Sequence, residues 1–213
     1  AAGCRALDIN NYPIPGELLL AESADDFSRG ARPDVCYAGL IIPIRGSREM
    51  VNAAGRTGIT LQLAGRLAPA ERTQLAALPG WEYVQELGMQ DRAGVSRTYG
   101  RSFAGLVLFH DEPNHTHAQP NKLFEYMSAG MPLIASNFPL WREVVEGSGA
   151  GICVDPLDVE AIAAAMRRLD GDRELAQRMG ECGRRAVNET YNWEAERRKL
   201  LALYARFEDK ADA

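Results

Sequence analysis

The stretch "FAGLVLFHDEPNHTHAQPNKLFEYMSAGMPLIAS", residues 103–136, decides the fold because it holds a complete strand–helix–strand unit. The apolar run at 103–109 predicts a buried strand, and the run at 132–136 predicts the next one. Between them the sequence predicts a helix over 121–129, which Gly130 ends. Two strands joined by a helix form a right-handed crossover, so this stretch indicates a parallel sheet.

The same alternation of apolar runs and helical stretches extends from Asp34 to residue 156. Several apolar runs are nearly unbroken, which is typical of parallel strands covered by helices on both faces. The predicted fold class is therefore α/β, a Rossmann-like doubly wound parallel sheet of about six strands. We expect strands over 35–42, 59–65, 82–87, 103–109, 132–136 and 151–155, and helices over 47–55, 68–78, 91–100, 121–129 and 139–146.

The chain divides into an irregular lead-in, residues 1–33, and a domain over 34–213. After residue 156 the domain continues as a helical tail with three amphipathic segments, "DVEAIAAAMRRLD", "RELAQRMGECGRRAVNE" and "NWEAERRKLLALYARF". In the last segment an apolar stripe recurs at helical spacing. Its members are Leu200, Leu203, Tyr204 and Phe207.

The composition excludes several classes of protein. Hydrophobic residues make up 46% and charged residues 25%, which indicates an ordinary globular domain. A formal net charge of −5 argues against a nucleic-acid partner, which would need a basic face. The four cysteines form no CxxC pair, so we expect a reducing, cytoplasmic compartment. There is no membrane-spanning run, and the chain begins without Met, so we expect a fragment of a longer protein.

In a doubly wound sheet, ligands bind beyond the carboxyl ends of the strands. The first loop at that edge, 39–46, reads "GLIIPIRG". Gly39 and Gly46 would let the backbone approach a ligand closely, and Arg45 offers a charged donor fork to phosphate. A simple turn bounded by glycines remains the alternative.

The loop 110–121 leads into the helix of the opening stretch, where Asn121 is a good N-cap or Pro120 a good first residue. Free N–H groups and the helix dipole make this start a natural seat for an anion. Lys122 would add positive charge there, and Glu125, one turn on, could accept hydrogen bonds from the two hydroxyls of a ribose. Alternatively, Lys122 is solvated and Glu125 only complements the helix dipole.

The two sides of this helix should differ, because residues three and four positions apart share a face. One sector is expected to face the core, and the other is expected to carry the polar residues with one tyrosine. The first sector is Leu123, Phe124 and Met127, and the second is Lys122, Glu125 and Tyr126.

All three histidines lie in the loop before this helix, which raises the possibility of a metal site. His110, His115 and His117 are accompanied by Asp111 and Glu112, but their spacing fits no closed zinc pattern. We expect no metal ligands here and assign these residues to the loop or to contacts with a substrate.

Three stretches carry a resemblance to a known family: "PNKLFEYMSAGMPLIASNFPLWREVVE", "GAGICVDPLDVEAIAAAMRRL" and "YNWEAERRKLLALY". They resemble the C-terminal, donor-binding half of a GT-B fold retaining glycosyltransferase, of the group 1 or family 4-like type. Upstream, "VCYAGLIIPIRGSREMVNAA", "LQLAG" and "GWEYVQELG" occur in the order that such a domain expects. The resemblance extends from about residue 34 to the end.

The resemblance implies a nucleotide-diphospho-sugar as substrate, linked to UDP or GDP, and no metal or other cofactor. Glu125 would hold the ribose hydroxyls, Arg45 and Gly46 would stabilise the diphosphate leaving group, and the base would rest near Leu87. The implied catalytic residues are Glu125, Arg45 and Lys122. The implied nucleotide-sugar-binding residues are Gly39, Arg45, Gly46, Leu87, His117, Ala118, Gln119, Pro120, Asn121, Lys122 and Glu125.

The chain departs from the family pattern at two positions. His117 stands eight residues before Glu125, where the family often has a first Glu that faces the donor sugar. Leu40 follows Gly39, where the family often has an Arg. The first departure leaves the recognition of the sugar open, and the second leaves the phosphate clamp to Arg45 and Lys122.

The resemblance implies transfer of a hexosyl-type sugar, with retention, to an acceptor saccharide or lipid-linked glycan. The acceptor domain, N-terminal in such enzymes, is absent, so we expect a partner domain elsewhere in a protein about twice as long. We expect the fragment to be inactive alone, its last apolar stripe to be partly exposed, and the longer protein to be cytoplasmic, with membrane association left open. A non-catalytic nucleotide-binding or interaction module and a nucleotide-sugar epimerase of the same fold are the alternatives.

Overall fold

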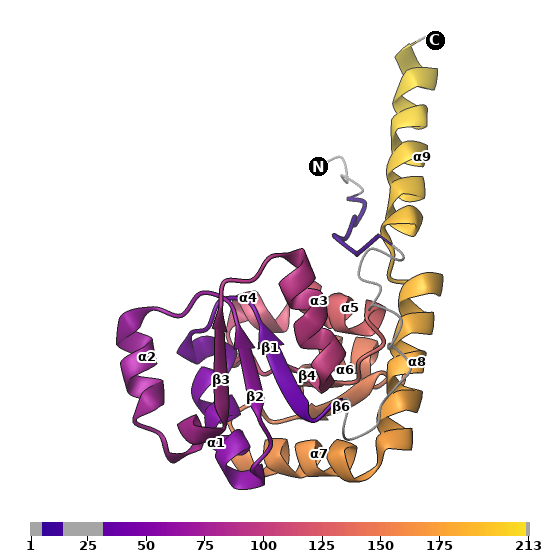
Figure 1. Ribbon diagram of the computed structural model, residues 1–213. Helices are drawn as coiled ribbons and strands as arrows, with labels where there is room; N and C mark the ends of the chain where they lie inside the picture. Colours follow the sequence, from indigo (N-terminus) through magenta and orange to yellow (C-terminus); the bar gives the residue numbers. More distant parts are fainter. Residues whose placement is uncertain (1–5, 15–31, 212–213) are drawn as a thin grey trace.

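The computed structural model describes residues 6–14 and 32–211, and six parallel strands form its one sheet among them. The strand order is β3-β2-β1-β4-β5-β6, so the winding reverses between β1 and β4 (Figure 1). This is the doubly wound, Rossmann-like topology that the sequence predicts. The strands are β1 (Asp34–Ala38), β2 (Leu61–Ala64), β3 (Val84–Gly88), β4 (Ser102–Val107), β5 (Leu133–Ser136) and β6 (Gly151–Val154).

The predicted helices are all present, with boundaries within two residues except at the end of the last helix. The α-helices are α1 (Ser47–Thr57), α2 (Pro69–Ala76), α3 (Arg92–Arg101), α4 (Pro113–Thr116), α5 (Asn121–Ser128), α6 (Pro139–Val145), α7 (Val159–Gly171), α8 (Arg173–Glu189) and α9 (Trp193–Ala211). The elements predicted from the sequence do not include the single-turn helix α4 or the 3₁₀ helices η1 (Pro43–Arg45) and η2 (Pro79–Tyr83). Elements this short carry no usable hydrophobic periodicity.

Among the strands the largest boundary error is at β1, which we predict over 35–42 and which ends at Ala38. Gly39 follows with φ of 143°, a conformation that turns the chain out of the strand. The apolar run nevertheless continues, because Ile41 is completely buried as part of a loop and forms an isolated bridge with Leu67. Burial without strand pairing explains why the pattern overran the strand.

The core lies on both sides of the central strands. Every residue of β2, β4 and β5 is buried, as expected when helices cover both faces of a parallel sheet. The main helix–helix contacts join α1 with α7 and α5 with α8. On the face shared by α3 and α5, the rings of Tyr99 and Tyr126 meet edge to face at 5.1 Å. Tyr126 lies directly on Gly105 of β4.

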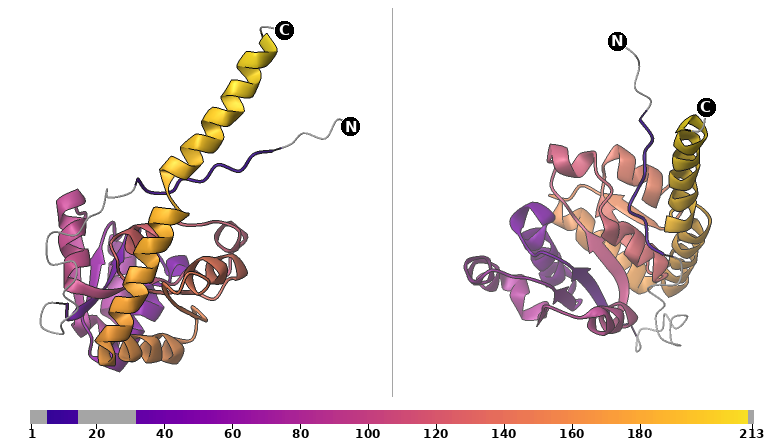
Figure 2. Two further views of the ribbon diagram at one scale, coloured as in Figure 1. Left: turned by 90° about the vertical axis from the view of Figure 1, so that its right-hand side faces the viewer. Right: turned by 90° about the horizontal axis from the view of Figure 1, so that it is seen from above.

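The last helix extends away from the rest of the domain. Figures 1 and 2 show α9 projecting beyond the body of the domain. Tyr204 and Phe207 are 60% and 61% exposed, and Leu201 is 53% exposed. Leu200 and Leu203 are half-buried. The expectation of a partly exposed apolar stripe on this helix is confirmed.

The lead-in meets the base of α9. The Trp193 N–H donates to the Pro13 carbonyl at 3.0 Å, and the Asn10 N–H donates to the buried Glu196 carboxylate at 3.1 Å. Tyr12 packs edge to face on Phe124 with the ring centroids 4.7 Å apart. Residues 6–14 have no regular secondary structure, as predicted, and most of the lead-in over 1–33 lies outside the described residues. Among the described helices, none is long and apolar enough to cross a membrane.

Gly105 provides a test of how tightly α5 packs on the sheet. A Cβ at this position would lie 2.4 Å from a ring carbon of Tyr126, so Gly105→Ala should lower the free energy of unfolding by about 3 kcal/mol. Gly100→Ala adds the same methyl group in α3 where no atom lies within 4 Å, and it should raise stability by about 0.5 kcal/mol. Urea denaturation measures both. A Gly105→Ala protein as stable as the parent would contradict the packing described.

Candidate functional site

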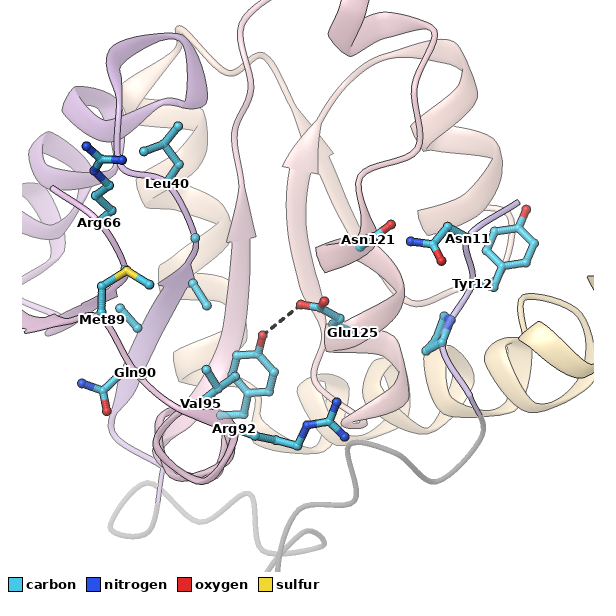
Figure 3. A pocket seen from close by; sticks show the side chains of 16 residues that line it. Asn11, Tyr12, Leu40, Arg66, Met89, Gln90, Arg92, Val95, Asn121 and Glu125 are labelled. Carbon is cyan, nitrogen blue, oxygen red and sulfur yellow. Dashed lines mark hydrogen bonds between the residues drawn. The ribbon is translucent and has the colours of Figure 1, made fainter. Parts of the chain in front are cut away.

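A cavity of about 640 Å³ opens at the carboxyl ends of β1, β2 and β3, beside the first turns of α5 (Figure 3). This is the edge at which a doubly wound sheet binds its ligands, next to the reversal between β1 and β4. The lead-in forms part of one wall. The lining residues are Asn11, Tyr12, Pro13, Ala38, Gly39, Leu40, Ala64, Gly65, Arg66, Met89, Gln90, Arg92, Val95, Tyr99, Asn121 and Glu125.

Two glycines shape the wall formed by the loops after β1 and β2. Gly39 and Gly65 have φ angles of 143° and 142°, which side-chain-bearing residues rarely adopt. A Cβ on Gly65 would lie 1.8 Å from the Gly39 carbonyl oxygen. The Gly39 N–H in turn donates to the Ala64 carbonyl at 2.8 Å. The two loops therefore run in backbone contact, and the cavity opens above them.

Lys122 lies beneath this wall, and the residue is only 9% exposed. A Cβ on Gly39 would be 2.8 Å from the Lys122 Nζ, so the absence of a side chain at Gly39 leaves room for the ammonium group. The same Nζ lies 4.7 Å from the ring centroid of Tyr37 and 5.3 Å from that of Phe109. Aromatic faces stabilise a cation in such positions.

The two predicted sectors of α5 are present, but both are largely buried. Leu123, Phe124 and Met127 are buried, as expected. In the other sector, however, Tyr126 is completely buried, Lys122 is buried and Glu125 is half-buried. The sector faces β1, β4 and the loop that follows β1, because the Tyr126 ring packs on Gly105 and its hydroxyl accepts a bond from the Ala38 N–H.

Arg45 and Lys122 form a positively charged pair. Burial, the largest cause, and the charge of Arg45 together lower the pKa of Lys122 to about 8, while the charge of Glu125 opposes the shift. The Arg45 guanidinium lies 5.1 Å from the centroid of the Phe109 ring, which Lys122 also approaches. Within the described part of the chain, the buried Nε of Arg45 has no hydrogen-bond partner. These two cations, at the start of a helix, would gain stability from an anion.

Glu125 lies on the cavity wall one turn into α5. Its Oε2 accepts a hydrogen bond from the Tyr99 hydroxyl at 3.4 Å (Figure 3). Asn121 is exposed on the same wall. Of the predicted site residues, the structure therefore brings Gly39, Asn121 and Glu125 together on the cavity surface, with Lys122 directly behind Gly39.

The predicted loop before α5 lies mostly outside the cavity lining. Pro120 occupies the N-cap position without a capping side chain, and Asn121 is the first helical residue. Both predicted alternatives, Asn121 as N-cap and Pro120 as first residue, are therefore wrong by one position. The Gln119 side chain accepts a bond from Tyr12 at 3.1 Å. The Ala118 carbonyl accepts one from the Trp141 side chain at 2.7 Å. His117 is exposed.

The remaining predicted residues, Arg45, Gly46 and Leu87, also lie off the wall. Gly46 is buried with φ of 76°, and a Cβ there would meet the Leu108 carbonyl oxygen at 2.2 Å, so it lets the loop after β1 pack on the end of β4. The Leu87 carbonyl accepts a bond from the side chain of Gln90. Met89 and Gln90, two and three residues further on, line the cavity in its place.

Several lining residues are not among the predicted site residues. Arg66 and Gln90 follow strand ends in loops that the fold rule marks as ligand-facing, so their position in the sequence was a usable signal. Tyr99 and Tyr12 carried no such signal. One lies inside a helix and the other in the irregular lead-in, and only tertiary contacts bring them to the cavity.

The histidine loop makes contacts within the protein. His110 Nε2 lies 3.3 Å from the Glu49 carboxylate, and His115 Nδ1 lies 3.0 Å from the His110 carbonyl. The His115 ring packs on Phe109 with a centroid distance of 4.8 Å. Among the residues that the structure describes, no group of three or more His, Cys, Asp or Glu side chains could hold a metal ion.

The fold and the cavity define a Rossmann-like α/β domain whose cavity lies beside the reversal of the sheet. Residues 109–186 match the family described as "Glycosyl transferases group 1". This match begins at the end of β4 and runs through α5 into α8. Over these residues the chain thus matches group 1 glycosyltransferases, and the domain has the Rossmann-like fold found in GT-B glycosyltransferases.

Curated relatives agree with this assignment. The chain is 36% identical to a GDP-mannose-dependent alpha-(1-6)-phosphatidylinositol monomannoside mannosyltransferase of Mycobacterium tuberculosis, over 92% of the chain and 53% of the relative. It is 27% identical to an MMP alpha-(1->4)-mannosyltransferase of Mycolicibacterium hassiacum, over 81% and 42%. The chain spans about half the length of the curated relatives it matches.

Solved structures share the fold. A sucrose-phosphate synthase of Thermosynechococcus elongatus superposes with a TM-score of 0.76 and 26% identity, over 91% of this chain and 51% of that one. Anabaena HepE, solved in complex with UDP, gives a TM-score of 0.77 at 15% identity, over 93% and 57%.

The burial of Lys122 predicts an unusual effect of pH on stability. Below pH 8 the lysine is protonated in both the folded and the unfolded chain, and the folded state carries the cost of a buried ammonium group. A shift from 10.5 to about 8 corresponds to about 3 kcal/mol. Lys122→Met should therefore stabilise the domain by up to about that amount at pH 7.

Between pH 8 and 10.5 the folded protein releases this proton while the unfolded chain retains it, so the parent gains stability relative to the variant. The advantage of Lys122→Met should disappear by about pH 10.5 in urea denaturation. Lys199→Met is the matched control, because its ammonium is half exposed in an ion pair with Glu196. A Lys122→Met advantage that does not depend on pH would show that the ammonium is not buried as described.

Proposed function

We propose that this domain binds the donor in a glycosyltransferase that moves a hexosyl-type sugar from a nucleotide-diphospho-sugar to an acceptor saccharide or lipid-linked glycan. The observation that carries the proposal is the proximity of two cations, Lys122 at the start of α5 and Arg45, beside a cavity of about 640 Å³. Among the described residues, the buried Nε of Arg45 has no hydrogen-bond partner. A nucleoside diphosphate supplies both negative charge and a ribose that Glu125 can hold.

The chemistry follows from where charge develops. Departure of a nucleoside diphosphate from an oxocarbenium-like sugar leaves negative charge on the phosphate oxygens. Donors already in place lower that barrier, because they need no reorganisation as the bond breaks. Arg45, Lys122 and the free amides of the first turn of α5 are the donors we assign to this role, with retention at the anomeric carbon and no metal requirement.

The pKa of Lys122 fits this assignment. An ammonium held at a pKa of about 8 by burial is still mainly protonated at pH 7. A bound diphosphate would raise the pKa of Lys122, because an adjacent negative charge favours the charged form. Binding should therefore strengthen the positive charge where the leaving group needs it.

The relatives narrow the donor without fixing it. The similar mannosyltransferase of Mycobacterium tuberculosis is GDP-mannose-dependent, and Anabaena HepE was solved with UDP, so we propose a GDP- or UDP-linked sugar. We further propose that a second domain binds the acceptor, that this domain is inactive without it, and that the longer protein acts in the cytoplasm. The exposed face of α9, with Tyr204 and Phe207, is our candidate contact with that domain. A two-domain structure in which both side chains stay exposed would refute the contact.

Donor binding is tested by thermal unfolding of the 213-residue chain with UDP, GDP, ADP, NAD and the sugar conjugates of the diphosphates. A ligand at 100 times its Kd should stabilise the domain by about 2.7 kcal/mol, which corresponds to a shift of about 5–10 °C. In Glu125→Ala the shift should fall to about a third, because the loss of charge-assisted bonds to the ribose costs about 2 kcal/mol.

Glu82→Ala is the control, because Glu82 is also a carboxylate but lies exposed in η2 and outside the cavity lining. It should leave the shift unchanged. The donor site as drawn here would be ruled out by shifts that are equal in both variants, or by a preference for NAD over every diphosphate.

The leaving-group role is tested in a longer protein that carries both domains. Arg45→Ala should lower kcat by a factor on the order of 10²–10³, because it removes a donor from the developing phosphate charge. Arg48→Ala, one turn further on and exposed in contact with Gln74, should change kcat little. Nucleotide binding without any sugar transfer by the parent would favour the non-catalytic module instead.

A further inference from the structure

Tyr99 is the group that holds the Glu125 carboxylate in place. Within the described part of the chain, the one hydrogen bond that this carboxylate accepts comes from the Tyr99 hydroxyl, which lies 3.4 Å from Oε2. Tyr99 lies on α3. It is completely buried, and it forms part of the cavity wall. The bond therefore joins α3, which follows β3, to α5, the second helix after β4, across the open end of the sheet (Figure 3).

The surrounding fold fixes the position of the Tyr99 ring. It packs edge to face on Tyr126 at 5.1 Å. Tyr126 is itself held from two sides, since its ring lies on Gly105 of β4 and its hydroxyl accepts a bond from the Ala38 N–H at 3.0 Å. The location of the Tyr99 hydroxyl is thus set by the backbones of β1 and β4.

The Tyr99 hydroxyl can act toward Glu125 only as a donor. An ionised carboxylate has no proton to give, and a tyrosine hydroxyl has one. Burial raises the pKa of Tyr99 well above its usual value, and the charge of Glu125 raises it further, so the hydroxyl keeps its proton. A donor at Oε2 fixes the plane of the carboxylate and leaves Oε1, with the outer lone pair of Oε2, available to the cavity.

We propose that Tyr99 is a positioning residue that orients the Glu125 carboxylate to accept both hydroxyls of a ribose, and thereby sets the preference of the cavity for ribonucleoside diphosphates. This inference rests on the proposed function, because it requires a nucleoside diphosphate in the cavity with its ribose at Glu125. Without the Tyr99 hydroxyl, the flexible glutamate side chain would have to be ordered by the ligand, and ordering a long side chain costs affinity.

The experiment measures, by calorimetry, the Kd of UDP, GDP and their 2′,3′-dideoxy counterparts for the 213-residue chain. The parent should prefer the ribose forms, and in Tyr99→Phe that preference should fall about fivefold, the effect of one net hydrogen bond. The Kd of the dideoxy forms should not change, because they do not engage Glu125. A merely structural role for Tyr99 would weaken both kinds of ligand alike.

Tyr83→Phe is the matched control. It removes the hydroxyl of a half-buried tyrosine that packs against the core but does not line the cavity. It should keep the ribose preference of the parent. In a Glu125→Ala background, Tyr99→Phe should have no further effect on that preference, since the group it positions is already gone.

The outcomes separate this inference from the proposed function. A parent chain that prefers ribose, with the preference unchanged in Tyr99→Phe, overturns the positioning role and leaves the donor site standing. A parent that binds no nucleoside diphosphate, or binds ribose and dideoxy forms equally, overturns the assignment of Glu125 and this inference with it. If Tyr99→Phe does not fold, Tyr99→Met removes the same hydroxyl with a side chain that adapts to the space.

Discussion

The site depends on the backbone contact between the loops that follow β1 and β2. Gly39 and Gly65 both adopt positive φ angles, and a Cβ on Gly65 would lie 1.8 Å from the Gly39 carbonyl oxygen. Because neither residue has a side chain, the loops close over the end of the sheet and still leave room beneath Gly39 for the Lys122 ammonium. Larger residues at Gly39 and Gly65 would force the loops apart and displace the Lys122 ammonium, which lies directly under the cavity wall.

A second constraint follows from placing Lys122 there. Burying an ammonium group destabilises the folded domain, as the lowered pKa of Lys122 indicates. The rings of Tyr37 and Phe109 offset part of that cost, and the nearby charge of Arg45 adds to it. A stable fold does not require such a pair of cations, whereas a bound diphosphate would be stabilised by it. The electrostatic cost at this point therefore supports the proposed function.

Three neighbouring side chains of α5 serve packing and binding together. They are Lys122, Glu125 and Tyr126. Tyr126 anchors the helix to Gly105 of β4 and to the Ala38 N–H at the end of β1. The same anchoring positions Tyr99 and, through it, Glu125. Lys122 lies one turn before Tyr126 and points under the adjoining loop. One short helix therefore links the core of the sheet to both ends of the site, so its packing and its chemistry cannot be separated.

The sequence by itself determined the order and type of nearly all the elements, because apolar runs of strand length and helices with clear periodicity are local patterns. It also placed Gly39, Asn121 and Glu125 at the correct edge, because a doubly wound sheet puts every strand-end loop on one side. The tertiary structure alone decided that Lys122 is buried, that His117 stays outside the cavity, and that Tyr99 and Tyr12 reach it. These depend on contacts between residues far apart in the chain, which no local pattern encodes.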